Sequence, residues 1–65
     1  MNKKAITIVD NAIKKATNER DRKGYRENLG YDQYNSVKSK VEKLDLGYSE
    51  TCDVMAYFHR KCDSI

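Results

Sequence analysis

YNSVKSKVEKLDLGYSETCDVMAYF, residues 34–58, contains two apolar stripes of helical spacing on either side of the break LDLGYS. The first stripe recurs at intervals of three, four and three residues, at Tyr34, Val37, Val41 and Leu44. The second stripe occupies one face of a helical projection, at Val54, Met55, Phe58, Cys62 and Ile65. Spacing of this kind predicts an amphipathic helix over residues 33–45 and another over residues 49–63.

The residues that flank the two stripes indicate where these helices begin and end. Asp32 and Ser49 each precede a stripe, and their side-chain oxygens suit the free N–H groups of a first helical turn. Both are therefore predicted N-caps. Gly47 follows the first stripe, where helices often end in a left-handed conformation that favours glycine. It is the predicted C-cap of the helix over residues 33–45.

The N-terminal part of the chain carries a third stripe, at Ile6, Val9, Ile13 and Ala16. This stripe predicts a helix over residues 4–20. Residues 17–23 contain no apolar side chain, so the helix either continues as a polar extension or stops where Gly24 turns the chain. We expect a polar connector over residues 21–32. The sequence thus predicts one all-α domain over residues 1–65, either a small three-helix bundle or a helical hairpin plus an N-terminal helix.

A chain of 65 residues encloses only a small core, because a domain of this size buries about 60% of the surface of its unfolded chain. The side chains predicted to form that core are Ile6, Val9, Ile13, Val37, Val41, Leu44, Val54, Met55 and Phe58. Burying each contributes roughly 1.5 to 3 kcal/mol, and the sum is smaller than the cost of ordering the chain. A monomer is expected to be marginally stable, which favours a homo-oligomer or a bound partner.

Neither a membrane span nor an export signal is expected. No apolar run is long enough to cross a bilayer, and the run that follows Lys4 is ended by Asp10 before it reaches the length of a signal segment. Cys52 and Cys62 lie about 15 Å apart along one predicted helix, which is too far for a disulfide. Free thiols are typical of a reducing compartment, so the expected location is the cytoplasm.

Charge is distributed unevenly along the chain. Residues 1–26 carry eight basic and three acidic side chains, a net charge of +5, and residues 27–65 carry five basic and seven acidic ones, a net charge of −2. Together they give the net charge of +3 of the whole chain. One interpretation is a phosphate-attracting patch on the predicted first helix. The alternative is a solvated helix face, with opposite charges of neighbouring copies meeting head to tail.

The sequence contains no pattern that is specific for catalysis or metal binding. Cys52, His59 and Cys62 are residue types that zinc prefers, but on one helix they spread over about 15 Å and cannot converge on one ion. A Cys–His nucleophile would also need an orienting group and an oxyanion site in a concave pocket. Gly24 and Gly30 are too far apart for a phosphate-binding loop. We expect no enzyme activity, no metal and no cofactor.

The predicted turn between the second and third helices resembles a DNA-binding motif. The run Leu46-Gly47-Tyr48-Ser49-Glu50, followed by Val54 and Phe58, is similar to the turn and recognition helix of AraC-type regulators, over about a third of the chain. The resemblance implies a helix-turn-helix over residues 37–60, in which residues 50–52 reach base edges. Two features depart from that pattern: Lys43 stands where crossing helices need a small residue, and Glu50 and Asp53 would face phosphates. The alternative is an ordinary helical hairpin.

The connector is the one place where positive charge, aromatic rings and flexible backbone coincide. Its candidate binding residues are Arg20, Arg22, Lys23, Tyr25, Arg26 and Tyr31. Arginine supplies planar forks for phosphate, and tyrosine supplies faces on which bases stack. Tyr34 belongs to the apolar stripe and is assigned to the core.

These residues predict a small, non-catalytic regulatory protein that binds nucleic acid or a phosphate-bearing nucleotide through the connector. The alternative is a protein target that the same surface docks on and inhibits, since tyrosine and arginine are also enriched at protein interfaces. The abundance of lysine, asparagine and tyrosine in so short a chain resembles the composition of small accessory proteins of phages and mobile elements.

Overall fold

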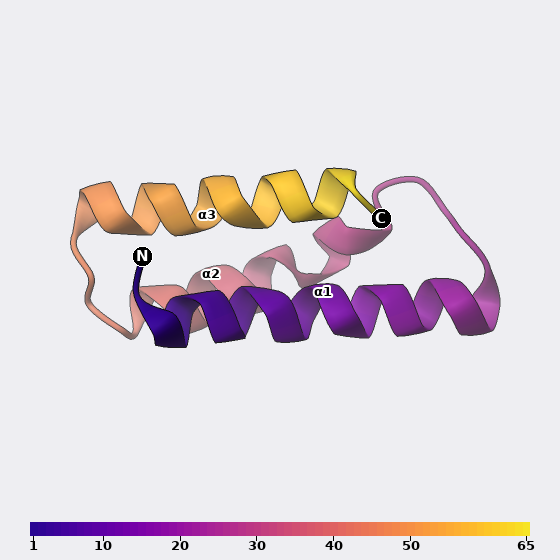
Figure 1. The fold of residues 1–65 in the computed structure, drawn as a ribbon, viewed down its shortest axis with the longest axis horizontal. Coiled ribbons are helices and arrows are strands. Elements are labelled where there is room, and N and C mark those ends of the chain that lie inside the picture. Colours follow the sequence, from indigo (N-terminus) through magenta and orange to yellow (C-terminus); the bar gives the residue numbers. More distant parts are fainter.

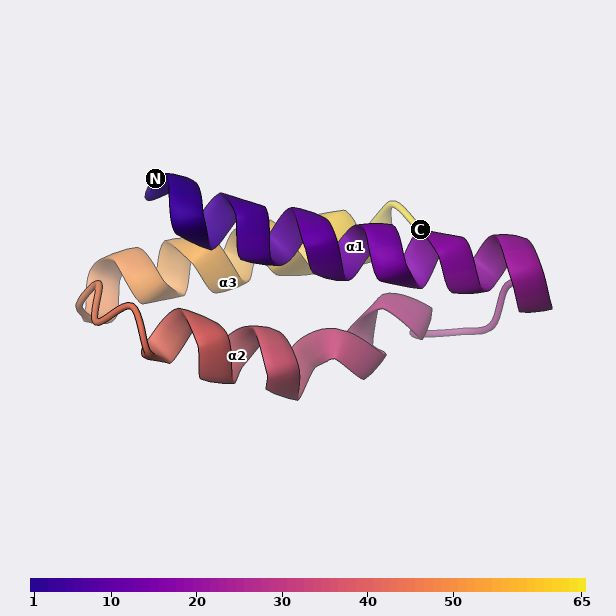
Figure 2. The same cartoon turned by 90° about the horizontal axis from the view of Figure 1, so that it is seen from below.

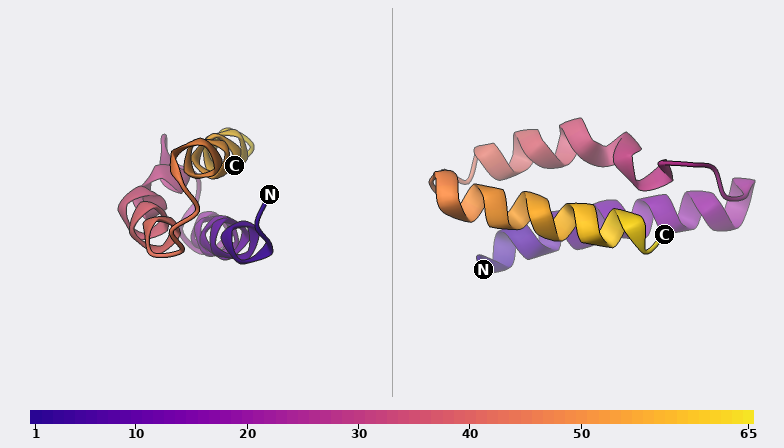
Figure 3. Two further views of the ribbon diagram at one scale, coloured as in Figure 1. Left: turned by 90° about the vertical axis from the view of Figure 1, so that its left-hand side faces the viewer. Right: turned by 90° about the horizontal axis from the view of Figure 1, so that it is seen from above.

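The chain folds into three α-helices and one short 3-10 helix. The computed structural model describes residues 1–65. The elements are α1 (Lys3–Lys23), the 3-10 helix η1 (Leu29–Gln33), α2 (Tyr34–Glu42) and α3 (Tyr48–Asp63). α2 runs antiparallel to α1 and α3 (Figure 1), and an end view places the three helices at the corners of a triangle (Figure 3). The predicted all-α fold is confirmed as a three-helix bundle that measures 36 × 17 × 15 Å.

α1 is longer than the predicted helix over residues 4–20. It begins after Asn2, whose side-chain Oδ1 accepts hydrogen bonds from the backbone N–H groups of Lys4 at 2.8 Å and Ala5 at 3.2 Å. This cap satisfies two of the donors that a helix N-terminus leaves free. With 21 residues α1 is the longest helix, yet no helix of the protein combines the length and the apolar character that a bilayer crossing requires.

The polar residues at the end of α1 remain helical. Arginine, lysine and glutamate are good helix formers, and basic side chains in a last turn interact favourably with the helix dipole. α1 therefore continues to Lys23, and its last turns extend beyond the other two helices (Figure 2). Gly24 ends it with a φ of 90°, a backbone conformation that favours glycine, and donates its N–H to the carbonyl of Arg20 at 2.7 Å.

The connector predicted over residues 21–32 is shorter and partly helical. Only residues 24–28 link α1 to η1, which packs against α1, α2 and α3. Leu29 and Gly30 of η1 are buried. A Cβ on Gly30 would lie 2.9 Å from Sγ of Cys62, so a larger residue would require a neighbouring side chain of α3 to shift.

Both predicted N-caps are wrong. The carboxylate of Asp32 pairs with Arg26, and α2 has no side-chain cap. α3 begins one residue before Ser49, with Gly47 in the N-cap position, so the Ser49 hydroxyl lies inside the first turn and makes no cap hydrogen bond. Charge pairing and turn geometry prevail over local capping preference at these two sites.

The predicted C-cap at Gly47 is also wrong. α2 ends at Glu42, with Lys43 as its C-cap, instead of extending to residue 45. The turn that follows contains two residues with positive φ, Asp45 at 54° and Gly47 at 87°. Glycine at position 47 thus serves the turn before α3 rather than the end of α2.

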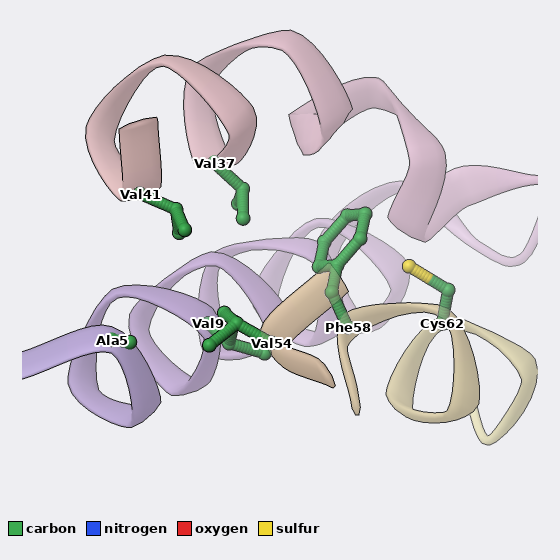
Figure 4. Packing of buried hydrophobic residues seen from close by; sticks show 7 residues of the cluster. All are labelled: Ala5, Val9, Val37, Val41, Val54, Phe58 and Cys62. Atoms are coloured by element: carbon green, nitrogen blue, oxygen red, sulfur yellow. The ribbon is translucent and has the colours of Figure 1, made fainter. Parts of the chain in front are cut away.

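The core is formed by side chains of all three helices that point toward one another (Figure 4). Its buried members are Ala5, Val9, Val37, Val41, Val54, Phe58 and Cys62. Five predicted core residues are confirmed as buried: Val9, Val37, Val41, Val54 and Phe58. The other four are only partly buried: Ile6, Ile13, Leu44 and Met55.

Small residues on α1 explain why its isoleucines lie at the edge of the core. Ala5, Val9 and Ala16 fall within about 40° of one another on a helical projection, and all three are buried. They let the other helices approach α1 closely, so Ile6 and Ile13 remain on the flank of this face.

Two polar contacts add to the packing of α3 against α1. The backbone N–H of Asn2 donates to Oε1 of Glu50 at 2.9 Å. The hydroxyl of Tyr57 donates to Oδ1 of Asp10 at 2.8 Å, and this hydrogen bond raises the pKa of Tyr57. The contacts lie at different levels of the bundle and hold the two helices in one register.

α2 and α3 lie side by side as an antiparallel hairpin (Figures 1 and 2). The helices of a DNA-binding helix-turn-helix instead cross at about 90 to 120°. The hairpin therefore gives no support to the helix-turn-helix hypothesis for residues 37–60.

Candidate nucleic-acid interface

Ion pairs occupy two of the arginines predicted to bind a ligand. Arg26 pairs with Asp32 and also lies 3.9 Å from Glu19, and Arg20 lies 3.3 Å from the neighbouring Asp21. Exposed pairs of this kind contribute little to stability. Each nevertheless places a carboxylate beside a guanidinium, so Arg20 and Arg26 present less unopposed positive charge than the sequence implies.

Tyr31 turns toward the bundle. Its ring packs edge-on against Phe58, with centroids 6.2 Å apart, and lies 5.4 Å from the ring of His59. Its hydroxyl donates to Oδ1 of Asp63 at 3.3 Å and lies 3.4 Å from Nδ1 of His59. Removal from water, and then the negative charge of Asp63, raises the pKa of Tyr31. Tyr34 packs similarly, 6.3 Å from Phe58, so both tyrosines contribute to the bundle.

Tyr25 remains available to a partner, since 67% of its surface is exposed. It borders a hollow of about 250 Å³ between the connector and the end of α3. The only charged residues that line this hollow are the acids Glu27 and Asp63. The hollow itself is therefore unsuited to phosphate.

Arg22 and Lys23 belong to a different surface, on the outer side of α1. They line a shallow depression of about 380 Å³ that contains no apolar residue. Its lining consists of Asn11, Lys14, Lys15, Asn18, Glu19, Arg22 and Lys23. None of its four basic residues forms an ion pair within the chain, and its single acid, Glu19, lies near Arg26. We call the four basic residues, together with Asn11 and Asn18, the α1 basic face.

The structure thus divides the six predicted binding residues. Arg22 and Lys23 join the α1 basic face, Tyr25 and Tyr31 border the acidic hollow, and Arg20 and Arg26 are paired with carboxylates. No residue lines both the depression on α1 and the hollow beside Tyr25. The predicted site is therefore distributed over separate surfaces.

Lys14 and Lys15 are not among the binding residues predicted from the sequence, because those residues were assigned where positive charge and tyrosine coincide. A signal for Lys15 was present, since Lys15 and Arg22 are seven residues apart and fall within about 20° of each other on a continuous helix. If the helix ended near residue 20, as predicted, Arg22 would not lie on the same helix face as Lys15. Because α1 continues to Lys23, Arg22 does lie on that face.

Neither cysteine nor His59 lines the depression on α1, and Cys62 lines the hollow beside Tyr25. No group of three or more histidine, cysteine, aspartate or glutamate side chains is arranged to hold a metal ion. Both thiols are free, with Cys52 exposed and Cys62 buried. Burial, and then the charge of Asp63, raises the pKa of Cys62 to about 11. At neutral pH this thiol is protonated and serves packing.

Comparison with models of protein families, with curated proteins and with solved structures finds no match for this chain. The resemblance of residues 46–58 to AraC-type regulators consequently gains no support from a matching family. Function must be inferred from the residues and their geometry.

Proposed function

We propose that this is a small, non-catalytic nucleic-acid-binding protein whose α1 basic face contacts the phosphate backbone. The observation that carries the proposal is the depression on α1, where Lys14, Lys15, Arg22 and Lys23 gather without an internal ion-pair partner. Cations that are unpaired within the protein are free to neutralise phosphates and release counterions. Asn11 and Asn18 add neutral hydrogen-bond donors of a kind that also contacts phosphate oxygens.

The dimensions of the α1 basic face suit several phosphates. Residues 11–23 cover about 18 Å of helix axis, and each strand of a DNA duplex presents a phosphate about every 3.4 Å along its axis. Four cations on this length are expected to neutralise about three phosphates. The logarithm of the binding constant should then fall with the logarithm of salt concentration with a slope near −3.

Tyr25 extends the proposed site toward single strands. It follows Lys23 by two residues, and 67% of its surface is exposed. A strand held on the α1 basic face and continuing past the end of α1 can stack a base on this ring, a contact worth about 1 to 3 kcal/mol in single-strand-binding proteins. Substitution of Tyr25 by alanine is then expected to weaken single-strand binding more than duplex binding.

The proposal is tested by fluorescence anisotropy with a labelled duplex and its single strand. Lys14→Glu/Lys15→Glu is expected to lower the affinity about tenfold or more at low salt, because it reverses two phosphate-binding charges. Lys38→Glu/Lys40→Glu makes the same change in net charge at exposed positions of α2 and serves as the matched control. No binding by the native protein at low salt, or an equal loss in both variants, contradicts the proposal.

A further inference from the structure

The end of the bundle at the turn between α2 and α3 carries an exposed aromatic ring. Tyr48, the first residue of α3, is 88% exposed, and Met1 is 56% exposed. Two open hollows of about 710 and 440 Å³ meet at Tyr48, and both are also lined by Leu46 and Gly47. Tyrosine combines a large apolar ring with a polar hydroxyl. An exposed tyrosine between two hollows is therefore suited to anchor an interface.

The linings of these two hollows are mostly acidic, whereas Lys3 and Lys4 lie beside Leu44 at the same end of the bundle. Four carboxylates line the two hollows, those of Glu42, Asp45, Glu50 and Asp53. Arg60 is the only basic residue in either lining. None of the four carboxylates forms an ion pair within the chain. We call these four acids, together with Tyr48, the acidic end.

Complementary charge is present on the α1 basic face of the same chain. All ion pairs of the protein lie between Glu19 and Asp32, so the four cations of that face and the carboxylates of the acidic end have no ion-pair partner within the chain, although Glu50 accepts a hydrogen bond from Asn2. The acidic end lies where α1 begins, whereas the α1 basic face occupies the middle and last turns of α1 (Figures 1 and 3). No ion pair joins the two surfaces within one chain, so their opposite charges can meet between two molecules.

We propose that a second copy of this chain docks its acidic end on the α1 basic face. Its Tyr48 ring packs along the aliphatic stems of Lys14 and Lys15, and its carboxylates face the ammonium and guanidinium groups. The contact joins two different surfaces, so it propagates head to tail into open chains or closes as a ring. The inference rests on the α1 surface of the proposed function, and it implies that a second copy and nucleic acid compete for that surface.

The first test is the molar mass in solution, measured by sedimentation from about 10 μM to about 1 mM protein at low and high salt. The mass is expected to rise with concentration at low salt and to return to that of the monomer at high salt, because exposed charges are screened. A mass that stays monomeric at every concentration at low salt overturns the inference. So does an oligomer whose mass does not respond to salt.

Charge-reversal variants identify the surfaces. Two double variants reverse the charge of one surface each, Lys14→Glu/Lys15→Glu and Glu42→Lys/Asp53→Lys. Each variant alone is expected to remain monomeric. An equal mixture of the two is expected to assemble, because their reversed surfaces are complementary. Lys38→Glu/Lys40→Glu, the control on α2, should assemble as the native protein does. Self-association that persists in both reversal variants assigns the oligomer to another face and overturns the inference. Circular dichroism verifies that each variant is helical.

A third comparison separates this inference from the proposed function. Glu42→Lys/Asp53→Lys and Tyr48→Ala are expected to raise the dissociation constant for self-association about tenfold or more, while nucleic-acid affinity is retained. Duplex DNA added to the native protein at low salt is expected to dissolve the protein-only assemblies. Nucleic-acid binding without self-association would remove only the inference, and self-association without nucleic-acid binding would remove only the proposed function.

Discussion

Gly30 lies where η1 meets the C-terminal end of α3, and the lack of a side chain there is a requirement of space. A Cβ at this position would lie 2.9 Å from both Sγ of Cys62 and Cδ1 of Ile65. Gly30→Ala is expected to lower the free energy of unfolding by about 1 to 3 kcal/mol through overpacking, as measured by urea denaturation. In a Cys62→Ala background the same change should be less destabilising, because the sulfur is gone. An equal loss in both backgrounds would show that the close approach to Cys62 is not the cause.

Cys62 makes stability depend on pH in the alkaline range. The pKa of its thiol is raised from 9.0 to about 11 by burial and by Asp63. Above pH 9 the thiol of the unfolded chain ionises while the folded thiol stays neutral, so its contribution to stability is complete below pH 9 and is lost as pH rises toward 11. Cys62→Ala should make the decline in unfolding free energy over this range shallower.

Cys52→Ala is the matched control for that experiment, because the Cys52 thiol is exposed. This variant should keep the alkaline decline of the native protein, measured by urea denaturation at several pH values. Equal declines in the native protein and in Cys62→Ala would contradict the assignment.

Among the elements, the helix starts distinguish the observed fold from the predicted one. Asn2 caps α1 through two hydrogen bonds to its side chain, so Asn2→Ala should lower the free energy of unfolding by about 1 kcal/mol. Ser49 makes no cap hydrogen bond, and Ser49→Ala should change stability by less than about 0.5 kcal/mol. A loss of about 1 kcal/mol in Ser49→Ala, measured by thermal or urea unfolding, would instead indicate that Ser49 is a cap and that α3 begins where the sequence predicts.

Apolar spacing predicted the existence of the helices better than their ends. Val37 with Val41, and Val54 with Phe58, repeat at four-residue intervals and are buried as expected. The ends depend on contacts that spacing does not encode. The carboxylate of Asp32 is drawn to Arg26, and no local pattern reveals that this pairing prevails over capping.

At the scale of the whole molecule, the sequence alone did not predict which charged side chains would be paired and which would be unpaired. The excess of positive charge in residues 1–26 was evident, but its division into paired and unpaired cations depends on the path of the chain after Gly24. That path brings Asp32 to Arg26 and turns Tyr31 onto Phe58. It leaves Lys14, Lys15, Arg22 and Lys23 without an ion-pair partner on α1.

The most direct test of the central claim, that nucleic acid binds to the α1 basic face, is an NMR titration of the isotope-labelled protein with a short DNA duplex at low salt. The amide signals that shift should gather on residues 11–23 of α1, with the largest changes beside Lys14, Lys15 and Arg22. The first turn of α3 around Tyr48 should change only as self-association is displaced, and Lys14→Glu/Lys15→Glu should abolish the shifts on α1. Shifts centred on the connector at residues 24–28 or on α2, or no shift at all, would contradict the claim.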